Sequence, residues 1–200
     1  MSAKRAEMLM NVAFDLFAQR NFASVTIKDI ANAAGVNTAL IYYYFSNKEG
    51  LFRATLESAI DQIFKDFETL EANATNPPIV IDEWLTIHLD YFERVQKFVK
   101  ICLDYKGAAE TDPVIDASIE SFYDKERQLL ADAVRDGIAA GLFREVDPNE
   151  LADHISTHLD GIMVRAVILP GYDLKAGIGG FRNVIWQLLG HTPEERDATQ

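Results

Sequence analysis

The stretch that decides the fold is residues 26–52, TIKDIANAAGVNTALIYYYFSNKEGLF. Thr26 lies three residues before Asp29, and this spacing predicts a helix start because the two side chains can satisfy free backbone amides there. Gly35 can adopt the left-handed conformation that ends a helix. Asn37 is a favourable cap for a second short helix. The stretch therefore predicts two short helices joined by a tight turn.

Two short helices in this arrangement form a helix-turn-helix, whose second helix enters a DNA major groove. Ser46, with Glu49 three residues later, predicts the start of a third helix. Residues 3–20 carry apolar side chains at helical spacing. We expect this segment to cover the pair, because a helix-turn-helix cannot bury enough apolar area alone.

The stretch resembles the N-terminal domain of the tetracycline-repressor (TetR) family of transcription regulators, with matching order and spacing. The matching residues are Thr26, Ile30-Ala31, Ala34-Gly35-Val36, Tyr42-Tyr43-Tyr44-Phe45 and Lys48-Glu49-Gly50-Leu51. Asn21 stands where the family has glycine, and asparagine tolerates the left-handed conformation. The resemblance covers about the first quarter of the chain. It implies an all-α protein of about nine helices, with an N-terminal three-helix DNA-binding domain and a C-terminal helical domain for ligand binding and dimerisation.

The expected domains are a helix-turn-helix DNA-binding domain over 1–50 (motif about 26–45), a ligand-binding and dimerisation domain over 51–190, and a polar tail over 191–200. Helical periodicity continues to the C-terminus, and no strand alternation competes with it. Further helices are expected over residues 47–72, 79–96, 98–108, 113–140, 148–169 and 173–189.

Composition fits a globular regulator of this kind. The chain has 200 residues, 48% hydrophobic and 25% charged, and one cysteine, Cys102, which fits a reducing compartment. No apolar signal core or membrane-length run is found, so we expect a cytoplasmic protein. The net charge of −12 is unevenly distributed: residues 1–53 hold six basic and four acidic side chains. This asymmetry favours DNA contact at the N-terminal end, although the excess alone is small.

The predicted DNA contacts lie off the apolar stripe of the second short helix and at helix starts. Val36, Leu40 or Ile41, and Phe45 are expected to point inward. Asparagine and threonine can bond base edges, the alanine and threonine methyls can contact thymine methyls, and tyrosine hydroxyls can bond phosphates. Core packing is the alternative for the tyrosines. The predicted DNA-binding residues are Thr26, Lys28, Asn37, Thr38, Ala39, Tyr42, Tyr43 and Lys48.

Aromatic, imidazole and thioether side chains gather on the central helices and suit a small lipophilic or aromatic ligand. The resemblance implies a cavity for such a ligand, while ordinary core packing is the alternative for each residue. The predicted ligand-binding residues are Trp84, His88, Tyr91, Phe92, Tyr105, Phe122, Tyr123, His154, His158 and Met163. No cofactor is predicted.

His154 and His158 lie four residues apart and share a helix face, a spacing that can bind a metal. Ile155 follows the first histidine, so the HExxH pattern is absent. A third ligand is not evident, and we therefore favour pocket polarity or interface hydrogen bonding over a metal site.

The final helix contains Gly177, Gly179 and Gly180, each of which lowers helicity by roughly 1 kcal/mol relative to alanine. Close approach of another backbone would explain them, and a loose helix start is the alternative. The resemblance implies a two-fold four-helix bundle made by the last two helices. The predicted dimer residues are Leu159, Met163, Gly177, Phe181, Ile185, Trp186 and Leu188.

The favoured function is a sequence-specific dimeric repressor that binds a palindromic operator in double-stranded DNA and is released by a small-molecule effector. The helix over 47–72 would transmit the signal. An activator of the same family, a helical enzyme and a metal-responsive binder using His154 and His158 are the alternatives. We expect no enzyme, because the sequence offers no nucleophile elbow, phosphate-binding glycine loop or catalytic pair.

Overall fold

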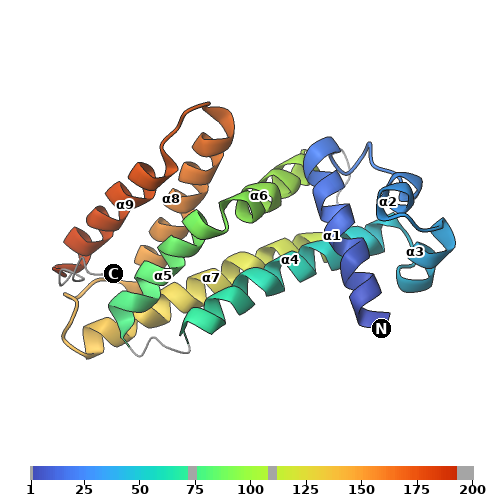
Figure 1. Cartoon of the computed structure of the whole chain (residues 1–200). Helices are drawn as coiled ribbons and strands as arrows, with labels where there is room; N and C mark the ends of the chain where they lie inside the picture. The colour runs from blue at the N-terminus through green and yellow to red at the C-terminus, as the bar shows by residue number, and fades with distance from the viewer. Residues whose placement is uncertain (1, 72–75, 108–111, 193–200) are drawn as a thin grey trace, which may run out of the picture. The chain divides into compact units, whose positions relative to one another are not determined.

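The chain is described by a computed structural model that covers residues 2–71, 76–107 and 112–192. These residues form nine helices and no strand (Figure 1), which confirms the all-α class. None of these helices is both long enough and apolar enough to cross a membrane. The helices are α1 Ser2–Arg20, α2 Ile27–Ala34, α3 Thr38–Tyr44, α4 Lys48–Glu71, α5 Pro77–Asp90, α6 Phe92–Lys106, α7 Pro113–Ala139, α8 Pro148–Ile168 and α9 Leu174–Leu189.

The start of α2 confirms the predicted capping box. The Thr26 hydroxyl oxygen accepts the backbone N–H of Asp29 at 3.1 Å, and the Asp29 carboxylate accepts the backbone N–H of Thr26 at 2.9 Å. The Thr26 hydroxyl also donates to the Asp29 carboxylate, and this bond together with the one from the Thr26 backbone N–H holds the pKa of Asp29 below its ordinary value. Gly35 ends α2 with φ of 66°, and Asn37 caps α3 through the N–H of Leu40 at 2.9 Å.

The turns after α1 and before α4 were also predicted from local sequence. Asn21 has φ of 69°, which confirms the left-handed turn after α1. The predicted Ser46–Glu49 start of α4 was wrong by one residue. The Asn47 side-chain oxygen accepts the N–H of Gly50 at 2.7 Å, so asparagine serves as the cap. Asparagine caps as well as serine and stands one residue nearer the helix.

The boundary between α5 and α6 also differs from the prediction of helices over 79–96 and 98–108. Helix α5 ends at Tyr91, whose φ of −109° and ψ of 24° are not helical. Apolar residues keep their helical spacing on both sides of this break, so periodicity alone places it wrongly. Pro77 and Pro78 occupy the first turn of α5, where proline is tolerated.

The chain forms two compact units. The first comprises Met1–Asp66 and Glu93–Phe122, and the second comprises Phe67–Phe92 and Tyr123–Gln200. Helices α4 and α7 contribute residues to both units. The predicted functional boundaries at 50 and 190 stay a prediction. Buried side chains of the first unit include Leu9, Phe17, Val25, Ile30, Ile41, Leu51, Phe52 and Leu56.

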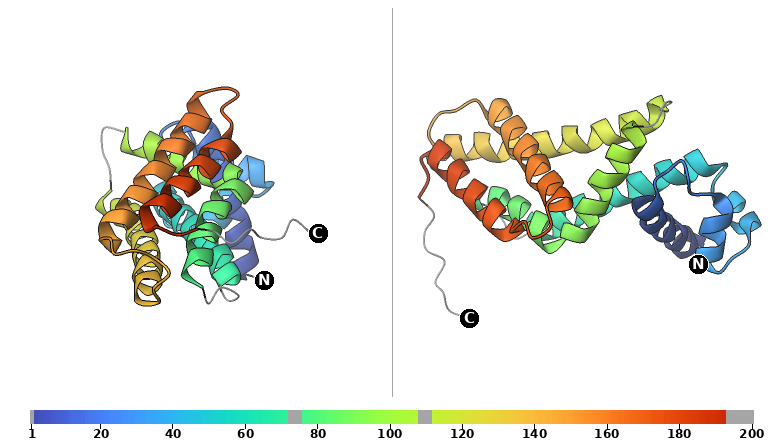
Figure 2. Two further views of the ribbon diagram at one scale, coloured as in Figure 1. Left: turned by 90° about the vertical axis from the view of Figure 1, so that its left-hand side faces the viewer. Right: turned by 90° about the horizontal axis from the view of Figure 1, so that it is seen from above.

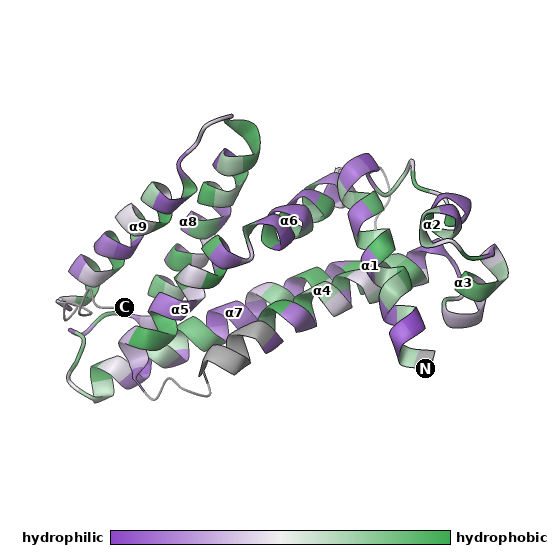
Figure 3. Cartoon of the chain, viewed as in Figure 1, coloured by the Kyte–Doolittle hydropathy of each residue, from purple (hydrophilic) through white to green (hydrophobic). Residues whose placement is uncertain are grey.

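In the second unit, α8 and α9 lie side by side, and α5 packs against α9 (Figure 2). The Arg182 guanidinium of α9 lies 2.7 Å from the Asp82 carboxylate of α5. Hydrophobic and hydrophilic residues alternate around α8 and α9, as amphipathic packing requires (Figure 3). The buried stripe consists of Leu151, Ile155, Leu159, Ile162 and Met163 on α8 with Ile178, Phe181, Ile185, Trp186 and Leu189 on α9.

Candidate nucleic-acid interface and effector region

One side of α3 anchors this helix in the first unit. Ile41 is fully buried and Phe45 is buried, whereas Leu40, Val36 and Tyr44 are half-buried. Of the two residues that the sequence left open, Ile41 is therefore the core residue. The buried side fixes how α3 is rotated and thereby decides which side chains face solvent.

The opposite side of α3 forms a surface that we call the reading face: Asn37, Thr38, Ala39, Tyr42 and Tyr43. All five side chains are exposed, with Tyr42 at 56% and Tyr43 at 76%. Core packing is thus excluded for these two tyrosines. The predicted contacts Thr26 and Lys28 are also exposed, and they line a shallow depression that includes Thr38 and Tyr42. The structure places seven predicted DNA contacts on the surface, while their contact with DNA stays a prediction.

Lys48 has a different environment from the other predicted DNA contacts. Its ammonium donates hydrogen bonds to the carbonyl oxygens of Phe22 at 3.0 Å and Val25 at 3.2 Å. It also lies 4.2 Å from the centre of the Phe22 ring, within range of a cation–π interaction. Two of its three protons are engaged in this way, which fixes the segment before α2 onto the start of α4. A phosphate contact through the third proton stays a prediction.

A buried polar centre in the second unit was not foreseen from the sequence. The Trp84 indole N–H donates to one carboxylate oxygen of Glu126 at 2.8 Å, and the Ser156 hydroxyl donates to the other at 2.5 Å. Burial raises the pKa of Glu126 to about 7, and the two hydrogen bonds partly oppose this. The available signal was a charged residue in step with the apolar stripe of Phe122 and Leu130 on α7.

His88 lies beside this centre and is buried. Its ring centre is 5.6 Å from that of Trp84, and its Nδ1 lies 2.8 Å from the Trp84 carbonyl oxygen. Burial lowers the pKa of His88 to about 4, although the bond to the carbonyl acts in the other direction. The imidazole is therefore neutral at pH 7 and donates from Nδ1 to that carbonyl.

The other predicted ligand-binding residues occupy several environments. Tyr105 and Phe122 belong to aromatic clusters of the first unit, where the Tyr105 ring centre lies 5.3 Å from that of Phe52. Tyr91 and Tyr123 are exposed, and Met163 is buried. Phe92 is half-buried. A cleft of about 240 Å³ brings Tyr123 together with Ser156, the residue that bonds Glu126. The ten residues divide between the two units, and a role in ligand binding stays a prediction for each.

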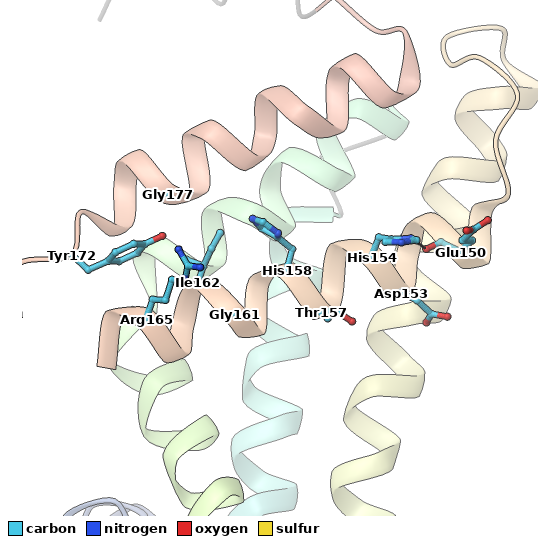
Figure 4. Close-up of a pocket in the computed structure, with 10 residues that line it drawn as sticks. All are labelled: Glu150, Asp153, His154, Thr157, His158, Gly161, Ile162, Arg165, Tyr172 and Gly177. Carbon is cyan, nitrogen blue, oxygen red and sulfur yellow. Dashed lines mark hydrogen bonds between the residues drawn. The ribbon is translucent and has the colours of Figure 1, made fainter. Parts of the chain in front are cut away.

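His154 and His158 lie on an exposed groove along α8 that extends to the start of α9 (Figure 4). The groove has a volume of about 680 Å³. His154 Nδ1 lies 2.7 Å from the Glu150 carbonyl oxygen, and the His158 ring stacks on Phe181 with 4.0 Å between centres. Within the described ranges, no three histidine, cysteine or acidic side chains are grouped closely enough to hold a metal.

The predicted dimer residues divide into two groups. Leu159, Met163 and Ile185 are fully buried in the second unit, with Phe181 and Trp186 nearly so, whereas Leu188 is 41% exposed. Gly177 faces its own chain, because an added Cβ would lie 2.4 Å from the Tyr172 hydroxyl. In contrast, a Cβ at Gly179 or Gly180 would meet no atom within 4 Å. Apolar surface that remains open on α8 and α9 is formed by Val167, Ile168, Val184 and Leu188.

Two family comparisons cover most of the chain. Residues 9–55 match the sequence model of the bacterial regulatory proteins of the tetR family. Residues 85–178 match the C-terminal domain of the BetI-type transcriptional repressors. The chain belongs to the tetR family. The TetR resemblance is thereby confirmed, and this member of the family is a DNA-binding transcriptional regulator.

Two individual relatives are transcriptional regulators. It is 26% identical over 142 residues to the HTH-type transcriptional repressor KstR2 of Mycolicibacterium smegmatis, covering 71% of this chain and 69% of that one. It is 22% identical over 165 residues to the HTH-type transcriptional regulator BetI of Brucella canis, covering 82% and 81%. These relatives regulate transcription, which argues against the enzyme alternative.

Solved structures show the same fold. A protein from Saccharomonospora viridis, crystallised in complex with choline, superposes with a TM-score of 0.82 at 21% identity over 92% of this chain and 96% of that chain. The ketosteroid regulator KstR2 of Mycobacterium tuberculosis superposes with a TM-score of 0.67 at 24% identity over 95% and 96%. The same fold thus occurs in a protein that binds choline and in a ketosteroid regulator, so fold alone does not identify the effector.

The raised pKa of Glu126 predicts a pH dependence of stability for this TetR-family chain. Its folded-state pKa of about 7 lies above the ordinary value of 4.5, so the stability it contributes is complete below 4.5 and is lost as pH rises to about 7. Glu126→Gln should remove this loss, which is about 3 kcal/mol at most. Urea unfolding of both proteins between pH 4.5 and 8 measures the difference.

The exposed Glu120 on the same helix provides a matched control, since Glu120→Gln should leave the pH profile unchanged. Parallel wild-type and Glu126→Gln profiles across this range would contradict the assignment.

Proposed function

We propose that this chain is a dimeric repressor that binds a palindromic operator and is released by a small-molecule effector. The reading face carries the proposal: four exposed side chains of α3 and the exposed cap residue Asn37 stand opposite the buried anchor Ile41. Such a helix can enter a major groove without any change in the core of its unit. A cytoplasmic location follows, because operator DNA lies there.

The reading face contains no lysine or arginine, so its chemistry differs from that of most direct base readers. Asn37 and Thr38 offer hydrogen bonds, and the methyl groups of Thr38 and Ala39 offer apolar contact with thymine. Tyr42 and Tyr43 offer hydroxyls to phosphates. We therefore expect the operator to be read through apolar contacts, water and DNA shape as well as direct hydrogen bonds.

Release requires an effector that prefers the non-binding conformation. Helix α4 begins shortly after the end of α3 and contributes residues to both units, so it is the element through which we expect the effector to act. A typical coupling of roughly 1–3 kcal/mol would weaken operator binding about 5- to 150-fold. An activator that uses the same DNA-binding head is the second candidate.

Selection of bound duplexes from a random pool at moderate salt tests the proposal. A dimeric repressor should enrich a palindrome whose half-sites lie about one helical turn or a little more apart. Enrichment of a single unrepeated site would refute the dimeric reading. Binding without any sequence enrichment would refute specific recognition, provided that small molecules were first removed by unfolding and refolding.

Effector candidates can then be screened by release of the selected duplex. The expected class is a small lipophilic or aromatic molecule. Choline is a useful contrasting probe, because the similar S. viridis protein binds it and the cleft near Ser156 contains the acidic side chains Asp124, Asp153 and Asp160. Release by choline alone would replace the lipophilic class with a cationic one.

Tyr42→Phe tests whether this side chain positions the DNA through a phosphate. Removal of the hydroxyl should weaken binding to all duplexes by a similar factor of about 3 to 10, the value of one hydrogen bond. Fluorescence anisotropy with the selected operator and its single-base variants measures this. A loss confined to one base position would instead assign Tyr42 to base recognition.

A further inference from the structure

The groove on α8 contains a row of four residues spaced four apart: Asp153, Thr157, Gly161 and Arg165. Residues at this spacing form one ridge along a helix surface. All four are exposed, and all four line the groove (Figure 4). We call this row the α8 ridge.

The charges of the α8 ridge would pair with those of a second α8 ridge that runs in the opposite direction. Its N-terminal end carries the carboxylate of Asp153, with Glu150 nearby, and its C-terminal end carries the guanidinium of Arg165 (Figure 4). The two ends are twelve residues apart, about 18 Å along a helix. A second α8 placed antiparallel would therefore set a base against an acid at both ends.

The middle of the α8 ridge has a matching steric pattern. A Cβ added at Gly161 would meet no atom within 4 Å, so this glycine leaves a gap on the surface that the chain itself does not fill. The antiparallel register that pairs Arg165 with Asp153 of the partner subunit also sets Gly161 opposite Thr157 of the partner subunit. Charge and side-chain size thus favour the same register.

We propose that the groove is occupied by α8 of a second copy, antiparallel, in the register that pairs Arg165 with Asp153 of the partner subunit. This inference rests on the proposed dimer and specifies which side chains orient its two protomers. Two-fold symmetry repeats each contact, so a dimer contains two such ion pairs. Val184 and Leu188 on the adjacent helix α9 are exposed and add apolar surface to the same helix pair.

Charge reversal provides the test. Arg165→Glu alone should place like charges together twice, as should Asp153→Arg alone, and each should weaken the dimer about 10- to 100-fold. An equimolar mixture of the two variants should form a heterodimer of nearly wild-type affinity, because one ion pair is then the native Arg165–Asp153 pair and the other joins the two substituted positions with reversed polarity. Sedimentation equilibrium over a range of concentrations measures all three.

Arg135 on α7 supplies a matched control, because it is an exposed arginine outside the groove. Arg135→Glu should leave the dimer unchanged. Gly161→Leu is a second variant that does not depend on charge: its side chain has free space within the chain and should leave helix content intact while weakening the dimer at least about tenfold.

The outcomes separate the inference from the proposed function. A wild-type chain that stays monomeric at every concentration would overturn the proposed dimer and this inference together. A wild-type dimer that tolerates Arg165→Glu would overturn the inference alone. The same holds if two weakened variants fail to restore each other in the mixture. Restoration in the mixture would establish the antiparallel register.

Discussion

Ala39→Asp is expected to reduce operator affinity by at least about 100-fold. Ala39 is exposed on the reading face, so a carboxylate there would be forced against base edges and phosphates without a partner. An unpaired charge buried at such an interface costs roughly 3 kcal/mol or more. Fluorescence anisotropy with the selected operator measures the loss.

The fold should be unaffected by this change, because position 39 lies in the first turn of α3, where an acid favours helix formation. Ala140→Asp introduces the same group at an exposed alanine of the second unit and serves as the control. Unchanged operator affinity in Ala39→Asp, with wild-type affinity in the control, would remove α3 from the DNA interface.

Trp84→Ala is expected to lower the free energy of unfolding by about 4 kcal/mol, the usual range for a buried aromatic side chain. Trp84 is fully buried, and its loss would also deprive the buried Glu126 carboxylate of a hydrogen-bond donor. For a chain of this size the melting temperature should fall by roughly 8–16 °C. Circular dichroism during thermal unfolding measures this shift.

Trp84→Phe separates the two contributions, since it keeps most of the apolar volume and removes the indole N–H. It should cost about 1–3 kcal/mol, the penalty for an unsatisfied buried acceptor. If Trp84→Ala instead keeps the wild-type melting temperature and changes only the response to effector, then Trp84 lines a ligand cavity.

The helix-turn-helix was predictable in detail because its signals are local. Thr26, Gly35 and Asn37 each act within three or four residues, so a cap or a left-handed turn can be recognised without knowing the rest of the fold. Local signals did not predict the end of α5 at Tyr91, because no proline or glycine marks it. Ser46 was misread because the adjacent Asn47 competes for the same role.

The buried polar centre around Glu126 was less predictable, since its residues come from separate helices. Trp84, Glu126 and Ser156 belong to α5, α7 and α8, and no local pattern reports that they meet. Aromatic composition singled out Trp84, whereas Glu126 and Ser156 could be recognised only from their tertiary contacts. Lys48 illustrates the same limit, because its two backbone carbonyl partners are more than twenty residues away in the sequence.

The separation of buried and exposed residues on α3 also bears on how the target sequences of such regulators diverge. Ile41 and Phe45 hold the helix, whereas Thr38, Ala39, Tyr42 and Tyr43 are exposed. Under the proposed function, substitutions at Thr38 and Ala39 after a gene duplication would change the target sequence with little cost to folding, because neither side chain belongs to the core. Selection on new target genes can therefore proceed while the scaffold stays the same.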